Sequence, residues 1–277
     1  MAVSMQQVKE LRDITNAGML DCKKALEASN GNIDEAMKIL REKGLADAKK
    51  RSDRETKEGG VYVISKDGKV AIALVACETD FVANNAQFKD ACNELMGKII
   101  DRGSENPDDY KEDLQHIAQI TKENVNVKKL RCLQIADNQY VSTYIHGNNQ
   151  IGVVVVYEMT DKTIADKAEF AEMAKNIALH VAASAPIYLT GNDVPDSDLE
   201  EQKTVFAKQM EGENKPANIL ENILKGKLSK YKSEICLMDQ KYIKDDKISV
   251  QQYLANTSKT LGSEVKVANF IRFNVGE

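Results

Sequence analysis

The stretch VAIALVACETDFVANNAQF, from Val70 to Phe88, decides how the chain around it can fold. It begins with a short apolar run, Val70 to Cys77, that a polar residue ends, which is typical of a buried strand. Thr79 and Asp80 follow, and both are residue types that cap helices. We therefore expect the chain to leave a sheet at this point and to enter a helix that continues past Phe88.

Composition limits the kind of protein that this is. The chain has 277 residues, 29% of them charged, and a formal net charge of −5. This length predicts two or three domains, and the negative charge gives no electrostatic reason to bind nucleic acid or an anionic membrane, so we expect protein partners. The sequence has no apolar run long enough to span a membrane and no signal or transit peptide, which predicts a cytoplasmic protein.

The reactive side chains are scattered along the sequence. The chain has five cysteines and three histidines, with no C-x-x-C pair, zinc-protease motif, phosphate loop or nucleophile elbow. We expect the thiols to be buried and reduced, and we expect no metal, no cofactor and no catalytic residue. The residues concerned are Cys22, Cys77, Cys92, Cys132, Cys236, His116, His146 and His180.

Residues 4–44 carry three apolar stripes at helical spacing, which predict three short helices. Asn30-Gly31 and Gly44 are expected to end helices in left-handed conformations, and Asn32 is expected to cap the third helix. Residues 46–58 alternate in charge and predict a solvated linker. The first domain, with this linker, is expected over residues 1–55. The stripes are Val8, Leu11 and Ile14; Cys22, Ala25 and Leu26; and Ile33, Ala36, Met37 and Leu40.

An α+β subdomain is expected over residues 56–139. Asp67-Gly68 is a strong hairpin signal between two apolar runs, so these runs predict antiparallel strands. Helical stripes over 88–101 and 110–122 predict helices that cover the sheet, and residues 130–136 predict a further strand.

The same pattern recurs about 81 residues later. The shift lays Val70 on Ile151 and Thr79-Asp80 on Thr160-Asp161, and with one extra residue Phe88 falls on Phe170. Two copies are too few for a solenoid, so we expect a second, related α+β subdomain over residues 140–277. Its end predicts a strand near 235–238, a helix over 249–256 and a strand over 271–275.

Phe81 stands at the turn after the quoted strand. A large aromatic there either fills the protein's own core or is offered to a partner, and residue statistics favour the core. Its counterpart in the repeat is Lys162, so the fold does not require an aromatic at this corner. This comparison favours the partner.

Residues 193–233 interrupt the second subdomain. They carry two narrow apolar stripes around a turn from Gly212 to Pro216, which predicts a protruding helical hairpin, or coiled coil. The stripes are Leu199, Phe206 and Met210, then Ile219, Leu220, Ile223, Leu224 and Leu228.

The segment CETDFVA, from Cys77 to Ala83, resembles the signature of bacterial elongation factor Ts, the exchange factor of the translational GTPase elongation factor Tu. The resemblance runs almost from end to end. It includes LRDITNAGM at 11–19, DCKKAL at 21–26, His146-Gly147, HVAAS at 180–184 and FIRFNV at 270–275.

This resemblance implies an N-terminal three-helix, ubiquitin-associated-like domain, a coiled-coil insertion, and a guanine-nucleotide exchange factor that performs no chemistry of its own. It implies that the corner around Phe81 wedges near the Mg²⁺ side of the GTPase, and that the head docks on the GTPase domain. The implied corner residues are Thr79, Asp80, Phe81, Val82, Ile120 and His146, and the implied head residues are Met19, Leu20 and Lys23. By residue type alone, Met19 also fits a core and His146 also fits an ordinary loop.

The expected partner is elongation factor Tu, in its GDP-bound and nucleotide-free states. A homodimer or 2:2 complex through the helical hairpin is a further expectation. Two alternatives stay open: a protein-binding adaptor with a ubiquitin-associated-like head, and a thiol-dependent enzyme that uses Cys77 or Cys22.

Overall fold

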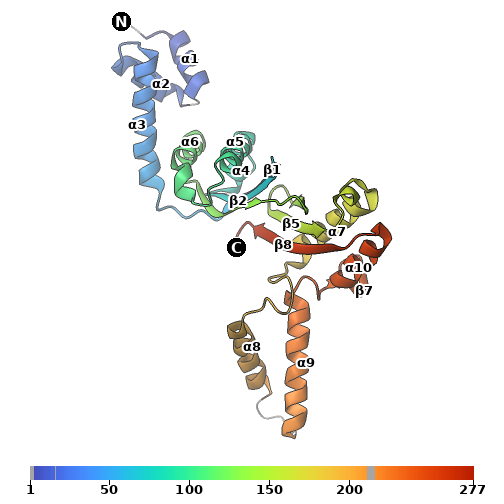
Figure 1. The fold of residues 1–277 in the computed structure, drawn as a ribbon. Coiled ribbons are helices and arrows are strands. Elements are labelled where there is room, and N and C mark those ends of the chain that lie inside the picture. The colour runs from blue at the N-terminus through green and yellow to red at the C-terminus, as the bar shows by residue number, and fades with distance from the viewer. Residues whose placement is uncertain (1–2, 16, 211–215) are drawn as a thin grey trace. The chain divides into compact units, whose positions relative to one another are not determined.

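The computed structural model describes residues 3–15, 17–210 and 216–277 (Figure 1). The fold is α+β, as predicted, and combines helices with antiparallel sheets. The chain divides into two compact units. Unit 1 comprises the described residues of Met1–Gln134, with Ile145–Gly152 and Phe273–Glu277, and unit 2 comprises those of Ile135–Tyr144 and Val153–Arg272. None of the described helices is long and apolar enough to cross a bilayer.

Unit 1 begins with three helices that enclose a small core of their own. They are α1 (Met5–Thr15), α2 (Met19–Ala28) and α3 (Ile33–Arg51). The apolar side chains buried between them include Val8, Leu11 and Leu26. Asn30 and Gly31 adopt the predicted left-handed conformations, with φ of 53° and 85°. Asn32 caps α3 as predicted, because its Oδ1 accepts a hydrogen bond of 3.1 Å from the amide of Glu35.

Two predictions for this region were wrong. Gly44 does not end the third helix, because α3 continues to Arg51 and includes the first part of the predicted linker. Gly44 is instead a point of close approach to another helix, where it lies against Gln119. Ile14 does not belong to the small core, since 56% of its surface is exposed.

The remainder of unit 1 contains an antiparallel sheet of order β1-β2-β3, formed by β1 (Glu58–Lys66), β2 (Lys69–Cys77) and β3 (Asn126–Gln134). Asp67 and Gly68 have φ of 49° and 70°, which is the conformation of the predicted hairpin turn. Helices α5 (Ala86–Arg102) and α6 (Lys111–Thr121) follow, and the 3₁₀ helix η1 (Pro107–Tyr110) precedes α6. Alternate residues of β2 and the apolar stripes of α5 and α6 share one buried cluster.

The single helix predicted after the quoted strand is broken into two. Helix α4 (Asp80–Ala83) has only four residues, and α5 starts at Ala86. Asn85 separates them, because its Oδ1 accepts a hydrogen bond of 2.8 Å from the amide of Gln87 and caps α5.

The second three-stranded sheet has the order β4-β5-β8, with β4 (Gln139–His146), β5 (Ile151–Met159) and β8 (Val265–Asn274), and most of each strand belongs to unit 2. The 3₁₀ helix η2 (Lys162–Asp166) and helix α7 (Ala168–Ser184) follow β5. Both ends of α7 lie 82 residues after those of α5, so the order of elements recurs at the offset that the sequence repeat predicts. Strands β6 (Lys241–Tyr242) and β7 (Asp245–Ser249), which were not predicted, precede α10 (Val250–Leu261).

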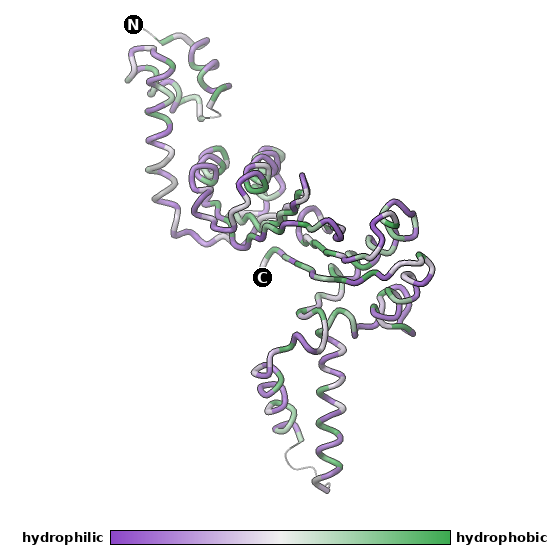
Figure 2. The backbone as a smooth tube through the Cα atoms, viewed as in Figure 1, coloured by the Kyte–Doolittle hydropathy of each residue, from purple (hydrophilic) through white to green (hydrophobic). Residues whose placement is uncertain are grey.

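Helix α8 (Asp196–Gln209) lies within residues 193–233, whereas α9 (Ala217–Ile235) starts within them and ends just after them. Phe206 and Tyr231 pack edge to face with ring centroids 6.4 Å apart, and Lys227 donates a 3.1 Å hydrogen bond to Gln209. Hydrophilic and hydrophobic segments alternate along α9 (Figure 2). The predicted turn from Gly212 to Pro216 lies outside the described residues, apart from Pro216.

The strand predicted near 235–238 is absent from this described part of the chain. Helix α9 continues to Ile235, and Cys236 forms only an isolated bridge with Tyr188. The reason is that the amide of Gln240 bonds back to the carbonyl of Cys236, 3.0 Å away, so that the chain turns there.

Candidate functional site

The corner that follows β2 presents Phe81 to solvent. We call residues 78–83 the Phe81 corner. Thr79 caps α4, because its Oγ1 accepts a hydrogen bond of 3.3 Å from the amide of Val82. The short helix turns Val82 and Ala83 toward the core and leaves Asp80 exposed and Phe81 82% exposed. The hypothesis that Phe81 fills the protein's own core was therefore wrong.

A carboxylate from a distant part of the chain holds this corner. Glu123 Oε2 accepts hydrogen bonds of 3.0 Å from the amides of both Glu78 and Thr79. Its Oε1 accepts a hydrogen bond of 2.6 Å from the hydroxyl of Thr79. Sequence reasoning missed Glu123, because nothing in the pattern around it links it to a residue 44 positions away. Its contacts mark it as part of the corner.

Glu78 ties the corner to two further segments. Its Oε1 accepts a hydrogen bond of 2.6 Å from the amide of Asn124, and its carboxylate lies 3.4 Å from the guanidinium of Arg54. Asn124 in turn donates to the carbonyls of Ser52 and Arg54, at 3.1 and 2.7 Å. The chain that leaves α3 therefore lies beside the base of the corner.

Ile120 lies in the last turn of α6. It is half-buried, and it lies three residues before Glu123. The helix ends at Lys122, which takes the left-handed conformation with φ of 61°. Thr121 stays helical and donates a 2.8 Å hydrogen bond to the carbonyl of Ile117. The end of α6 therefore forms without glycine.

His146 is exposed at the end of β4, in a turn that is anchored close to the corner. Asn148 donates to Asn84 Oδ1 over 2.6 Å and accepts from Lys89 Nζ over 2.7 Å. Asn149 exchanges hydrogen bonds with the backbone of Val61, at 2.7 and 2.9 Å. The structure thus brings the turn of His146 to the segment that directly follows the Phe81 corner. The two asparagines, with φ of 57° and 69°, were not singled out from the sequence.

The head residues form a separate exposed group at the start of α2. Leu20 is 63% exposed and Met19 is 42% exposed, so Met19 is not a core residue of the head. Lys23 is also exposed and lies 3.7 Å from Glu27, one turn further along the helix. Asn16 lies outside the described residues.

The thiols have the environment of structural residues. Burial raises the pKa of Cys77 to about 12 and that of Cys92 to about 12, and it also raises the pKa of Cys22. A raised pKa leaves little thiolate at neutral pH, which disfavours nucleophilic work. Within the described ranges, no group of three or more His, Cys, Asp and Glu side chains could hold a metal ion.

His180 is fully buried in unit 2 and makes a hydrogen bond with each ring nitrogen. Nδ1 accepts from the amide of Ile243 at 3.2 Å, and Nε2 lies 2.9 Å from Gln240 Oε1. Nε2 therefore carries the proton of a neutral ring. Burial lowers the pKa of His180, which fits the structural role that the sequence favoured.

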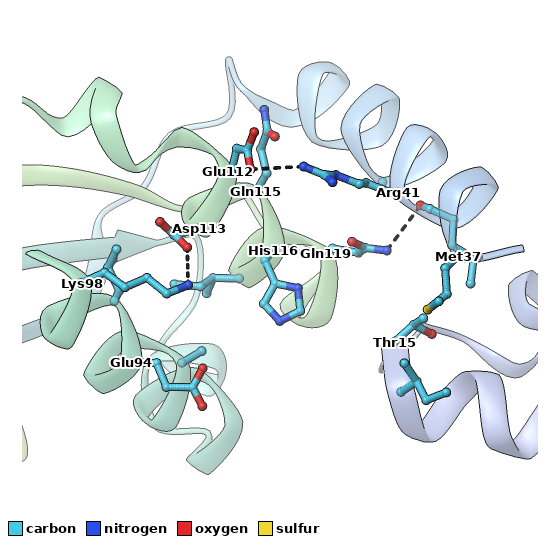
Figure 3. Close-up of a pocket in the computed structure, with 16 residues that line it drawn as sticks. Thr15, Met37, Arg41, Glu94, Lys98, Glu112, Asp113, Gln115, His116 and Gln119 are labelled. Atoms are coloured by element: carbon cyan, nitrogen blue, oxygen red, sulfur yellow. Dashed lines mark hydrogen bonds and ion pairs between the residues drawn. The ribbon is translucent and has the colours of Figure 1, made fainter. Parts of the chain in front are cut away.

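A cavity of about 380 Å³ lies in unit 1 between the head helices and helices α5 and α6 (Figure 3). Four of the charged side chains that line it form two ion pairs. Arg41 lies 3.1 Å from Glu112, and Lys98 lies 2.5 Å from Asp113.

An exposed aromatic on a fixed corner and exposed Met and Leu on a helical head are features of a protein that binds other proteins. The chain belongs to the elongation factor Ts family: the model of the family "Elongation factor TS" matches residues 78–277, which begin at the Phe81 corner. Elongation factor Ts of Borrelia hermsii is 40% identical over 278 residues and covers 100% of both chains. The protein of the same name from Borreliella burgdorferi strain B31 is 40% identical over 276 residues, or 99% of each chain. That of Treponema denticola is 40% identical over 278 residues, covering 100% of this chain and 99% of its own.

Proposed function

We propose that this chain is a guanine-nucleotide exchange factor that binds elongation factor Tu and promotes GDP release by protein contact. The partner binds in its GDP-bound and nucleotide-free states. The observation that supports this most directly is Phe81, which is 82% exposed. It stands on a corner that hydrogen bonds to Glu123 fix within the protein. A side chain so placed loses little conformational freedom on binding, which favours an interface anchor.

The exchange mechanism requires binding that differs between the two states of the GTPase. A factor with equal affinity for the GDP-bound and the nucleotide-free GTPase does not shift the equilibrium between them. A shift of about ten-thousandfold in that equilibrium needs about 5.5 kcal/mol of differential binding. Burial of one Phe contributes only about 1.5 to 3 kcal/mol. Phe81 therefore acts with other contacts, for which Ile120 and His146 are the candidates.

Asp80 supplies the electrostatic part of the mechanism. It is exposed at the first position of α4, next to Phe81. A GTPase holds GDP through Mg²⁺ and the backbone amides of its phosphate loop. A carboxylate brought to this side of the site competes for the cation or for helix ends, which loosens the nucleotide.

The head is proposed to be a ubiquitin-associated-like docking module over residues 1–55. Its separate buried cluster supports a domain that folds around its own core. Met19, Leu20 and Lys23 form its docking surface on the GTPase. The rest of the chain is proposed to form two core subdomains, 56–139 and 140–277.

Residues 193–233 are proposed to be a helical hairpin, or coiled coil, that governs assembly. Val205 and Ile219 are exposed on α8 and α9, at 41% and 44%. Narrow apolar stripes of this kind invite a partner helix, so a homodimer or a 2:2 complex is the proposed assembly.

The test is the release of a fluorescent GDP analogue from elongation factor Tu, followed by stopped flow as the concentration of this protein is raised. Accelerated release supports an exchange factor. An adaptor with a ubiquitin-associated-like head would leave the rate unchanged, which would overturn the proposal. Alkylation of the thiols in the folded protein separates out a thiol-dependent enzyme, since the exchange factor keeps its activity.

A further inference from the structure

The Phe81 corner carries a four-residue helix, which cannot be stable by itself. Forming one helical turn costs more conformational entropy than its few hydrogen bonds return. Val82 and Ala83 pack on the core at one end of α4, but Asp80 and Phe81 have no such support. The position of Phe81 therefore depends on what fixes the start of this helix.

Thr79 is the residue that starts α4, and its hydroxyl performs two tasks at once. Thr79 Oγ1 accepts from the amide of Val82 and donates its proton to Glu123. Since the proton points to Glu123, a lone pair is left to face Val82. Glu123 also accepts from the amides of Glu78 and Thr79, so a single carboxylate fixes both the backbone and the cap. Hydrogen bonds to an ionised acceptor are about twice as strong as neutral ones.

In the second repeat, a side chain also fixes the corner after the central strand by hydrogen bonds, but that side chain is not a carboxylate. In unit 2 the corresponding corner is tied by a hydroxyl: Ser263 Oγ lies 3.0 Å from Thr160 Oγ1 and accepts from the amide of Asp161 at 3.2 Å. Ser263 and Glu123 both precede the third strand of their sheets. The corner held by a carboxylate carries the exposed Phe81, whereas the corner held by a hydroxyl carries Lys162.

We propose that Glu123 is a positioning residue for exchange, which acts through Thr79 to hold Phe81 in its binding orientation. This inference rests on the proposed function. It goes beyond that function because Glu123 belongs to none of the expected docking residues and its printed partners are Glu78 and Thr79. Its effect on release passes through Phe81.

The test is a double-mutant cycle of Glu123→Ala and Phe81→Ala, measured by stopped-flow release of a fluorescent GDP analogue from elongation factor Tu. We expect Glu123→Ala to slow release about tenfold in the wild-type background and less than about twofold in the Phe81→Ala background. Equal factors in both backgrounds would overturn the proposal, because Glu123 would then act independently of Phe81. Glu123→Gln, which keeps one oxygen acceptor, should recover part of the rate.

Ser263→Ala is the matched control, since it loosens the equivalent corner of the other repeat. We expect it to leave release within about twofold of wild type. A loss as large as that of Glu123→Ala would show that both ties serve only the fold, and would overturn the proposal.

Amide hydrogen exchange of the protein alone separates failure of this inference from failure of the proposed function. Glu123→Ala should speed the exchange of the amides of Glu78, Thr79 and Val82 at least about tenfold while the amides of β2 stay protected. Unchanged protection at the corner would overturn the positioning role even if the wild-type protein is an active exchange factor. If wild type fails to release GDP, the proposed function fails, and the role of Glu123 in exchange fails with it.

Discussion

Gly44 in α3 lies against the side chain of Gln119 in α6, so closely that a Cβ at position 44 would stand 2.8 Å from Gln119 Cδ. Gln119 also donates a hydrogen bond of 3.4 Å to the carbonyl of Leu40, and Arg41 pairs with Glu112 nearby (Figure 3). The absence of a side chain at Gly44 therefore lets the third head helix approach the core helix of unit 1.

Gly44→Ala tests this contact. Alanine in a helix interior gains about 1 kcal/mol over glycine, but here its Cβ displaces Gln119 and its hydrogen bond to Leu40. We expect the two effects to offset each other, so that urea denaturation gives a free energy of unfolding within about 0.5 kcal/mol of wild type.

The control repeats the substitution in a Gln119→Ala background. With the clash removed, Gly44→Ala should stabilise the protein by about 1 kcal/mol. If the gain is the same in both backgrounds, Gly44 and Gln119 do not constrain each other.

Alkylation with iodoacetamide should distinguish the thiols. Burial raises the pKa of Cys77 to about 12, whereas Cys132 is only half-buried. We expect Cys132 to react at least about tenfold faster than Cys77 in the folded protein, as followed by mass spectrometry. Modification of Cys132 should leave GDP release unchanged. Loss of release in step with alkylation would instead favour a thiol-dependent activity.

The stability of the protein should depend on pH through His180. Burial lowers the pKa of His180 in the folded protein. In the unfolded chain the pKa is about 6.5. As the pH falls below about 6.5, the unfolded chain therefore binds a proton at His180 before the folded chain does. The stabilisation is fully present above that pH and is lost as the pH falls through this window. In His180→Asn, which does not titrate, urea denaturation should show a flatter dependence between about pH 7.5 and pH 5. Parallel curves for variant and wild type would contradict this.

Replacement of residues 199–229 by a short Gly-Ser turn tests the role of α8 and α9 in assembly. This range keeps Asp198, which accepts from the hydroxyl of Tyr188, and Lys232, which donates to the carbonyl of Gly191 at 3.2 Å. The remaining chain should therefore stay folded. We expect sedimentation to show a smaller assembly while GDP release stays within about twofold of wild type. If sedimentation changes only by the amount that the deleted mass explains, α8 and α9 have no role in assembly.

Local signals in the sequence predicted much of this fold. The Asp67-Gly68 turn, the apolar run of β2 and the repeat that relates α5 to α7 all depend on residues close together in the chain. Gly44 was misread because its reason is tertiary: an isolated glycine near the end of a helical stripe resembles a cap, although a neighbouring helix explains it.

The candidate site was predicted less completely, for the same reason. Phe81 could be singled out because the repeat supplied Lys162 for comparison. Glu123 and Asn148 could not, because their partners lie 44 and 64 positions away and nothing local in the sequence pairs such polar residues. The residues that present the aromatic are found only once the fold brings them together.

Phe81 and its counterpart Lys162 allow the sharpest test of the proposed function. Phe81 is 82% exposed, so Phe81→Lys should leave the melting temperature nearly unchanged. An interface anchor of this kind contributes about 2 kcal/mol or more, so GDP release should slow about thirtyfold or worse. Phe88→Ala is the contrasting variant, because Phe88 is fully buried and its loss should cost about 3 to 5 kcal/mol of stability.

Two further variants complete this test. Lys162→Phe should gain no exchange activity, because an aromatic at that corner lacks Glu123 and the turn of His146 around it. Asp80→Ala should slow release without affecting the melt, since its exposed carboxylate acts on the partner. Stopped-flow release of a fluorescent GDP analogue and thermal melts of each variant provide both readouts. If Phe81→Lys melts as wild type and also releases GDP as fast, Phe81 is an exposed side chain without a role in exchange, and the contact with the GTPase lies elsewhere on the chain.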